Sequence, residues 1–262
     1  MDFGVVMQSS WSAEDLVSIA AVAEKEGLDF LLVSDHYLVP FSNSTVDTWT
    51  VLAAIAAKTS TIRLGTCVTP IPFRPPQLLA KVVSTVDQIS KGRVVLGVGA
   101  GWYKPEFEAY SEWSEDRVRV AKTLEGLDLI RKLWTEREPF DFRGNYYVAK
   151  GAILEPKPVQ RPHPPLWFGT NGKYMLKMAR KYASGWVPPV PGVGMDVYRE
   201  VAAALAGSQV KIKFNGTFEQ IAANIEAYAD LGCDGGALSM VPPAELPAAI
   251  ERLAREVIPS YR

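Results

Sequence analysis

The sequence is poor in the residues that form disulfides and most zinc sites. Its 262 residues include two cysteines, Cys67 and Cys233, and two histidines, His36 and His163. The cysteines lie far apart and in no CxxC spacing, and no HxH or HExxH pattern occurs. These absences exclude a disulfide framework, a zinc knuckle and a catalytic zinc site, so we expect no bound metal.

The chain also lacks a strong charge of one sign and a long apolar segment. Its formal net charge at pH 7 is -1, with basic and acidic residues interspersed, so no field exists to attract nucleic acid or a membrane surface. No run of about 18 apolar residues occurs, and the first residues lack the basic flank of a signal peptide. We expect a cytoplasmic protein whose partners are small molecules.

What the sequence does contain is a regular alternation of buried-strand runs and amphipathic helical segments. A hydrophobic fraction of 48% is enough for a large core, and 262 residues match the roughly 250 of a (β/α)8 barrel. Each of eight predicted strands precedes a predicted helix. These strands are Phe3–Met7, Leu28–Val33, Ile62–Val68, Val94–Gly99, Leu166–Gly169, Gly185–Val187, Val210–Phe214 and Ala237–Met240.

This count predicts a single domain over residues 1–262, a (β/α)8 TIM barrel. A doubly wound open sheet is the structural alternative, but the Gly-rich turns come late and have no acidic residue placed for a ribose. The alternation of strands and helices is interrupted between Pro139 and Lys150, after the long helix that follows the fourth strand. The residues of this segment predict a small hairpin. A loop is expected from Pro188 to Gly194.

One strand end stands out, because the apolar run Phe30–Val33 stops abruptly at Ser34, Asp35 and His36. In a parallel barrel the carboxyl ends of the strands carry the active groups. His36 is therefore the first candidate for proton chemistry, since an imidazole titrates near neutral pH. Asp35 could orient His36, or it could cap the next helix; His36 could also do no more than tie loops together.

Two glycine-rich turns follow other strands. Gly97–Gly101 resembles a phosphate loop only superficially, because we expect no helix directly after it, but it would let a flat ring approach the backbone beside Trp102. Gly169–Gly172 precedes a helix, where free backbone N–H groups and the helix dipole favour a phosphate. Four basic residues on that helix would add charge or would form a solvated face: Lys173, Lys177, Arg180 and Lys181.

Aromatic and thiol side chains also occur near the predicted mouth. Trp102, Trp167 and Trp186 would suit stacking on a large aromatic cofactor, although tryptophans at such positions also serve as core residues. Cys67 lies at the end of the third predicted strand, where a small buried hydrophobe is commoner than a nucleophile.

With these residues assembled, the chain resembles the luciferase-like flavin and deazaflavin oxidoreductase family over nearly its full length. The segments that carry the resemblance are LLVSDHY, RLGTCVTP, PPQLLAKVVSTVD, GRVVLGVGAGW, LIRKLW with FRGNYY, PLWFGTNG and ARKYASGWVP. The resemblance implies a barrel that holds FMN or coenzyme F420 at its C-terminal mouth, and a homodimer. It also implies that Asp35 and His36 lie near the ring edge, and that Cys67–Val68 forms a bulge behind the ring with a cis peptide bond.

The motif Ser34–Asp35–His36 resembles the deazaflavin branch of the family, and this resemblance favours F420 over FMN. Glu106 is a possible proton donor, although an exposed loop acid is the plainer interpretation. Trp102 stands where the family's sugar-phosphate dehydrogenases carry an acid, which argues against alcohol oxidation with that acid. The short Ala206–Gln209 connection leaves no room for the insertion that covers substrate in many members, and so predicts an open mouth.

These observations predict a hydride-transferring oxidoreductase that uses coenzyme F420 and a small organic substrate. The alternatives are an FMN-dependent monooxygenase fed by a separate flavin reductase, and a flavin-binding relative without turnover. The candidate catalytic residues are His36, Asp35 and Glu106. The candidate cofactor-binding residues are Cys67, Val68, Thr69, Gly99, Gly101, Trp102, Gly169, Thr170, Asn171, Gly172 and Trp186.

Overall fold

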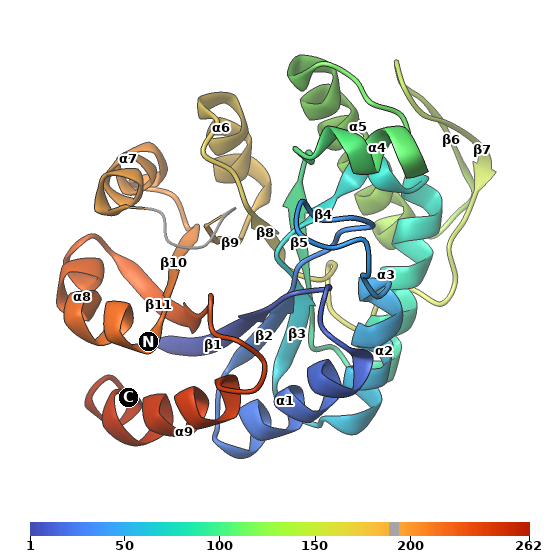
Figure 1. Cartoon of the computed structure of the whole chain (residues 1–262). Coiled ribbons are helices and arrows are strands. Elements are labelled where there is room, and N and C mark those ends of the chain that lie inside the picture. The colour runs from blue at the N-terminus through green and yellow to red at the C-terminus, as the bar shows by residue number, and fades with distance from the viewer. Residues whose placement is uncertain (189–193) are drawn as a thin grey trace.

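Parallel strands close into a barrel in the computed structural model, which describes residues 1–188 and 194–262 (Figure 1). In this part of the chain, eight strands follow one another around the barrel, and the pairings of β3 with β5 and of β1 with β11 complete the circle. The strands in this order are β1 (Asp2–Met7), β2 (Phe30–Val33), β3 (Arg63–Thr66), β5 (Val94–Gly99), β8 (Leu166–Phe168), β9 (Gly185–Trp186), β10 (Lys211–Gly216) and β11 (Cys233–Leu238). Closure confirms the predicted barrel over the open sheet.

A ring of helices surrounds the strands (Figure 1). The sequence encodes several of their starts. Ser12 and Asp47 accept hydrogen bonds from backbone N–H groups of α1 and α2, and Thr217 with Gln220 forms a capping box at the start of α8. The surrounding helices are α1 (Ala13–Lys25), α2 (Thr48–Lys58), α3 (Pro76–Ser90), α5 (Asp116–Thr135), α6 (Lys173–Tyr182), α7 (Met195–Leu205), α8 (Phe218–Asp230) and α9 (Leu246–Glu256). No helix of the described residues is long and apolar enough to cross a membrane.

The structure also contains several smaller elements. The predicted hairpin is present as antiparallel β6 (Phe140–Arg143) and β7 (Val148–Ala152). Strand β4 (Thr69–Pro70) continues beyond β3 alongside β5, and short 3-10 turns occupy Ile71–Phe73 and Ile258–Ser260. The expected loop from Pro188 to Gly194 falls mostly on residues 189–193, which lie outside the described residues.

Two element predictions were wrong in instructive ways. The last strand begins at Cys233, four residues before the predicted Ala237, because Gly235 and Gly236 belong to the sheet and do not form a turn. A Cβ on Gly236 would lie 2.1 Å from the Phe214 ring, so this glycine serves close strand packing. The sequence also gave no sign of α4 (Lys104–Tyr110), a short helix that begins soon after the Gly97–Gly101 turn.

The barrel interior is mostly apolar, apart from buried Lys213, whose Nζ pairs with Asp2 and Asp234 at the amino end. Inward-facing Val6, Phe30, Leu32, Val95 and Trp167 form a buried cluster there. This packing leaves the carboxyl ends of the strands for polar side chains, and that end is where the candidate site lies.

Candidate functional site

Two adjoining cavities open at the carboxyl ends of the strands. They share His36, Cys67 and Trp102 in their linings. Their volumes, about 350 and 310 Å³, lie at the lower end of the range for small-molecule sites. We call the one that contains the glycine turns the glycine cavity; it is also lined by Val68, Pro70, Gly99, Ala100, Gly101, Gly169, Thr170 and Asn171. We call the other the apolar cavity; it is also lined by Val6, Gln8, Ser34, Val39, Pro40, Phe41, Pro188, Asn215 and Met240.

His36, on the wall between the cavities, is held by Glu106. Its Nδ1 lies 2.9 Å from Glu106 Oε1 and 3.1 Å from Oε2. The backbone N–H groups of Tyr37 and Leu38 also donate to Glu106 Oε2, at 3.1 and 3.4 Å. The Glu106 side chain is fully buried, so the interpretation as an exposed loop acid is wrong. Since Nδ1 faces Glu106, Nε2 is the ring nitrogen left for chemistry in the mouth.

The short helix α4 brings Glu106 to His36. Gly101, at a φ of +78°, turns the chain out of β5, and a Cβ there would lie 2.3 Å from the Phe107 ring. Phe107 is buried against Phe73, with ring centroids 4.5 Å apart. This contact fixes α4 over the end of the barrel and points its preceding residue, Glu106, inward. Gly101 is thus required for the turn and for packing of α4.

Asp35 neither bonds His36 nor caps α2, so both expectations for it are wrong. Its carboxylate forms a two-pronged ion pair with Arg74, at 2.8 and 3.0 Å, and accepts a hydrogen bond from Thr69 Oγ1 at 2.7 Å. Burial opposes the charge on Arg74, but the Asp35 carboxylate outweighs this and raises the pKa of the guanidinium. Arg74 also bonds Asp47, which is the true cap of α2. Thr69 is fully buried in this network and does not line the glycine cavity.

The Cys67–Val68 bond is cis, as the resemblance implied. The Cys67 thiol is partly exposed in the lining of both cavities and donates to the Pro188 carbonyl at 3.6 Å. Desolvation raises the pKa of this thiol to about 12, which argues against a nucleophile. Val68 explains two of the glycines. A Cβ on Gly99 or Gly169 would lie 2.5 or 2.7 Å from a Val68 methyl, so these positions leave room for Val68 itself.

The turn before α6 offers unpaired donors to the glycine cavity. The backbone N–H groups of Thr170 and Asn171 bond no group in the described chain, and both residues line the cavity. Gly172 caps α6 but lies outside the lining, and its N–H donates to Thr170 Oγ1 at 3.2 Å. Lys173 and Lys177 are exposed on α6, whereas Arg180 donates to the Ala204 carbonyl and Lys181 lies over the Tyr182 ring. These free donors and nearby cations suit an anion.

Of the three tryptophans expected near a cofactor, Trp102 alone lines the mouth. It is 56% exposed, and its ring lies edge-on to His36 at 6.0 Å. Trp186 is fully buried among the outer helices, because its neighbours Gly185 and Val187 take the inward positions of β9. Its Nε1 donates to the Thr170 carbonyl at 2.7 Å, so it braces the phosphate turn and offers no stacking face.

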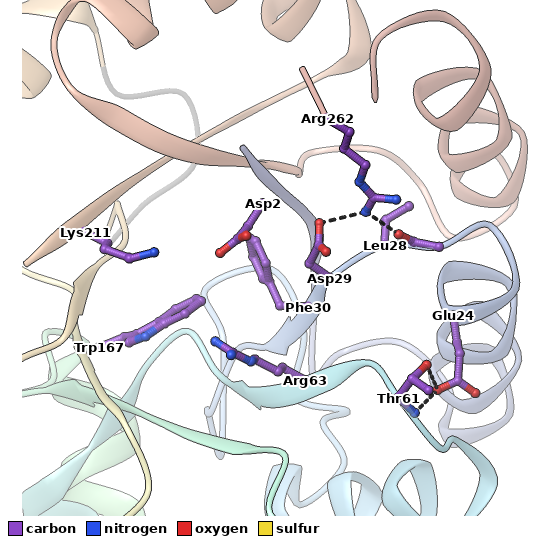
Figure 2. Close-up of a pocket in the computed structure, with 11 residues that line it drawn as sticks. Asp2, Glu24, Leu28, Asp29, Phe30, Thr61, Arg63, Trp167, Lys211 and Arg262 are labelled. Atoms are coloured by element: carbon purple, nitrogen blue, oxygen red, sulfur yellow. Dashed lines mark hydrogen bonds and ion pairs between the residues drawn. The ribbon is translucent and has the colours of Figure 1, made fainter. Parts of the chain in front are cut away.

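Trp167 lies at the opposite end of the barrel. It lines a polar cavity of about 470 Å³ near the starts of the strands (Figure 2). The charges there are largely paired: Arg262 bonds Asp29 at 3.0 Å, and Glu24 accepts hydrogen bonds from the loop that contains Thr61. Pairing of this kind at the amino ends of barrel strands is typical of a stabilising region.

Sequence reasoning missed Arg74, the cation that compensates the buried carboxylate beside His36. Its one local signal was its position: it lies between Phe73 and two prolines, a few residues after the end of the third predicted strand. It missed the cavity-lining Gln8 and Asn215 as well, because isolated amides at strand ends look like ordinary surface residues.

Comparison with known proteins agrees with this geometry. Residues 1–211 match the family model described as luciferase-like monooxygenase. An FMNH(2)-dependent dimethylsulfone monooxygenase of Pseudomonas putida is 29% identical over 80% of this chain, which spans 59% of that relative. An F420-dependent glucose-6-phosphate dehydrogenase of Amycolatopsis mediterranei is 30% identical over 93% of the chain and 77% of the relative. The monooxygenase RslO1 from Streptomyces bottropensis has the same fold, with a TM-score of 0.86 at 19% identity and 100% coverage of both chains.

The matched segment includes every strand end that forms the glycine cavity. Both F420-dependent and FMN-dependent oxidoreductases occur among the similar proteins. The chain belongs to the luciferase-like monooxygenase family.

Proposed function

We propose that this protein transfers hydride between coenzyme F420 and a small organic substrate. The observation that carries the proposal is the pair of cavities that meet at His36: one with free backbone donors beside an α-helix N-terminus, the other mostly apolar. The first suits a phosphate-bearing cofactor with a flat ring, and the second suits a substrate. F420 would supply a ring carbon that gives or takes hydride.

The residues present fit such a cofactor. The backbone N–H groups of Thr170 and Asn171, with Lys173 close by in sequence, would hold its phosphate. Val68 would lie behind the ring, and the exposed face of Trp102 would cover part of it. Holding the ring and substrate on either side of His36 would orient the two reacting carbons and exclude water.

His36 would hold or release a proton at Nε2 beside the substrate. Glu106 fixes the orientation of the ring through Nδ1, so it acts as a positioning residue. Asp35 would act more remotely still, because its partners are Arg74 and Thr69.

Three observations support F420 over FMN. The motif Ser34–Asp35–His36 resembles the deazaflavin branch, and the exposed side chains of Lys173 and Lys177 suit an anionic tail. The chain is also similar to an F420-dependent dehydrogenase over 93% of its length. The similarity to an FMNH(2)-dependent monooxygenase keeps a second candidate, an FMN-dependent monooxygenase that receives reduced flavin from a separate reductase. We further propose that residues 1–262 form a single domain and that the protein is a homodimer.

Titration of the purified protein with F420 and with FMN, followed by tryptophan fluorescence, tests the cofactor. We expect tighter binding of F420, and tighter binding of FMN would overturn the choice. A Glu106→Gln variant should keep F420 binding but lower turnover by about 10-fold or more, because proton transfer by a positioned side chain contributes roughly 100-fold or more. Glu108→Gln is the matched control, since Glu108 lies on the same helix with an exposed side chain. Equal turnover of both variants would remove the His36–Glu106 pair from the mechanism.

A further inference from the structure

A large side chain in an unusual backbone conformation marks the rim of the apolar cavity. Met240, just beyond β11, has a φ of +64°, in the left-handed region that side chains rarely adopt. The other such residue among those described, Lys91, forms the left-handed C-cap of α3, where this conformation is ordinary. Met240 caps no helix and is 55% exposed. Neither helix capping nor burial therefore accounts for a large side chain at this position.

Met240 lies between two hollows of the structure. It lines the apolar cavity, which contains His36, and also a hollow of about 540 Å³ at the starts of α8 and α9. We call this second hollow the outer groove; it is also lined by Thr217, Phe218, Glu219, Val241, Pro242, Ala244, Glu245, Ala248, Ala249 and Arg252. Most of these side chains are apolar, so an apolar lining extends from His36 past Met240 to α9.

Two more large apolar side chains are exposed at the same mouth. Phe41 is 75% exposed and Trp102 is 56% exposed, and both line the apolar cavity together with Met240. The loops after β2, β5 and β11 thus each place an apolar side chain at one opening. Single exposed apolar residues are ordinary, but a group of them around a cavity is typical of a ligand-binding site.

Neither hollow offers an excess of positive charge. In the described lining of the apolar cavity, His36 is the member that titrates near neutral pH, and the buried Glu106 carboxylate offsets its charge. Residues 189–193 contain no ionisable side chain in the sequence. The charged members of the outer groove have an acidic excess; they are Glu219, Glu245 and Arg252. A phosphorylated substrate would lose its hydration here without gaining a cation.

We propose that this protein acts on uncharged molecules with an extended apolar tail, whose reactive end lies at His36 and whose tail crosses Met240 into the outer groove. This inference rests on the proposed function, which places the reaction at His36. The Met240 side chain is flexible and polarizable, so it can adapt to tails of different shape. Contact of the tail with Phe41, Met240 and the outer groove would remove apolar surface of both molecules from water, which stabilises the complex.

Binding of an alcohol series to the full chain tests this substrate class. The probes are 1-butanol, 1-hexanol and 1-octanol, and calorimetry gives their affinities. Complete burial of one methylene raises affinity about 4-fold, so a tail half covered by an open groove should gain about 2-fold for each added methylene. Glucose 6-phosphate should not displace octanol. Equal affinities of butanol and octanol, or displacement of octanol by glucose 6-phosphate, would overturn the proposal.

A Met240→Gly variant separates ligand contact from a structural role. It should leave the free energy of unfolding nearly unchanged, because relief of the left-handed strain offsets the greater freedom of glycine in the unfolded chain. We expect it to lower octanol affinity about 5-fold and to leave butanol affinity unchanged. Leu78→Ser is the control, because Leu78 is 53% exposed on α3 and lines neither hollow. An octanol affinity that survives in Met240→Gly would refute the contact.

A second variant locates the tail in the outer groove. Ala248 is exposed on α9 within its lining, and Ala248→Gln would fill the groove with a polar amide. We expect octanol affinity to fall about 3-fold while butanol affinity stays the same. A groove covered by a second copy of the chain would instead give no dependence on chain length, and Ala248→Gln would change the oligomeric state seen by sedimentation. That result would overturn the proposal.

The outcome is separable from that of the cofactor titration. Chain-length dependence without F420 binding would preserve the substrate subsite and reject the proposed reaction. F420 binding without chain-length dependence would preserve the reaction and reject the substrate class.

Discussion

Arg74 compensates the buried charge of Asp35, and replacing it tests the network behind His36. Arg74→Met removes the cation but keeps most of the side-chain volume. The Arg74 side chain is 9% exposed and that of Asp35 is 1% exposed, and two contacts of 2.8 and 3.0 Å join them. In the variant, Thr69 Oγ1 is the one remaining side-chain donor to Asp35 among the described residues.

The expected destabilisation follows from this geometry. Removing one partner of a buried ion pair costs about 3–5 kcal/mol, because the other charge is left without compensation. The loss of the second contact, to Asp47, adds little, since the Asp47 side chain is 45% exposed. We therefore expect Arg74→Met to lower the free energy of unfolding by about 3–5 kcal/mol. Neutralising both residues, in Asp35→Asn with Arg74→Met, should restore about 2–3 kcal/mol of it.

Urea unfolding followed by tryptophan fluorescence measures both values. Arg199→Met is the control, because Arg199 pairs with Asp196 on the surface, with side chains 61% and 91% exposed, and should cost under about 1 kcal/mol. A loss for Arg74→Met no larger than that for Arg199→Met would contradict the compensation of Asp35 by Arg74. A double variant that loses the full sum of the two single losses would contradict it equally.

Two further predictions concern ionisation. Desolvation raises the pKa of the Cys67 thiol to about 12, so iodoacetamide at pH 8 should alkylate it on the order of 1,000-fold more slowly in the folded than in the urea-unfolded protein, as followed by mass spectrometry. Comparable rates would contradict the raised pKa. Burial opposes ionisation of Glu24, but hydrogen bonds from Thr61, Ile62 and Ser60 outweigh it and lower its pKa from 4.5 to about 2. The stability that Glu24 contributes is therefore complete above about pH 4.5 and is lost as the pH falls toward 2. Glu24→Gln should cost about 1–2 kcal/mol at pH 7, after allowance for its partial exposure, and nearly nothing near pH 2; an equal loss at both pH values in urea titrations would refute the assignment.

The sequence predicted the barrel because local patterns encode its elements. Apolar runs mark strands buried on both faces, and Ser12 and the Thr217–Gln220 box mark helix starts that the structure confirms. The same logic failed for α4, whose seven residues are too few to show a helical period. It also failed for the start of β11, because Gly235 and Gly236 lie inside the strand.

At the candidate site, sequence identified the strand ends and the structure decided which side chains meet. His36 and Glu106 are 70 positions apart, and Asp35 and Arg74 are 39 apart, so no local pattern could pair them. In the structure, Asp35 pairs with Arg74 and does not bond His36.

The sequence by itself determined the order of strands and helices, the helix caps and the set of strand ends that face one mouth, because these follow from short-range periodicity and backbone hydrogen bonding. The tertiary structure alone decided that Trp186 packs outside the barrel while Trp102 lines the mouth, that Glu106 is buried against His36, and that Asn215 faces the apolar cavity. The physical reason is that side-chain direction and long-range charge pairing are fixed by barrel closure and register, which bring together residues that are distant along the chain.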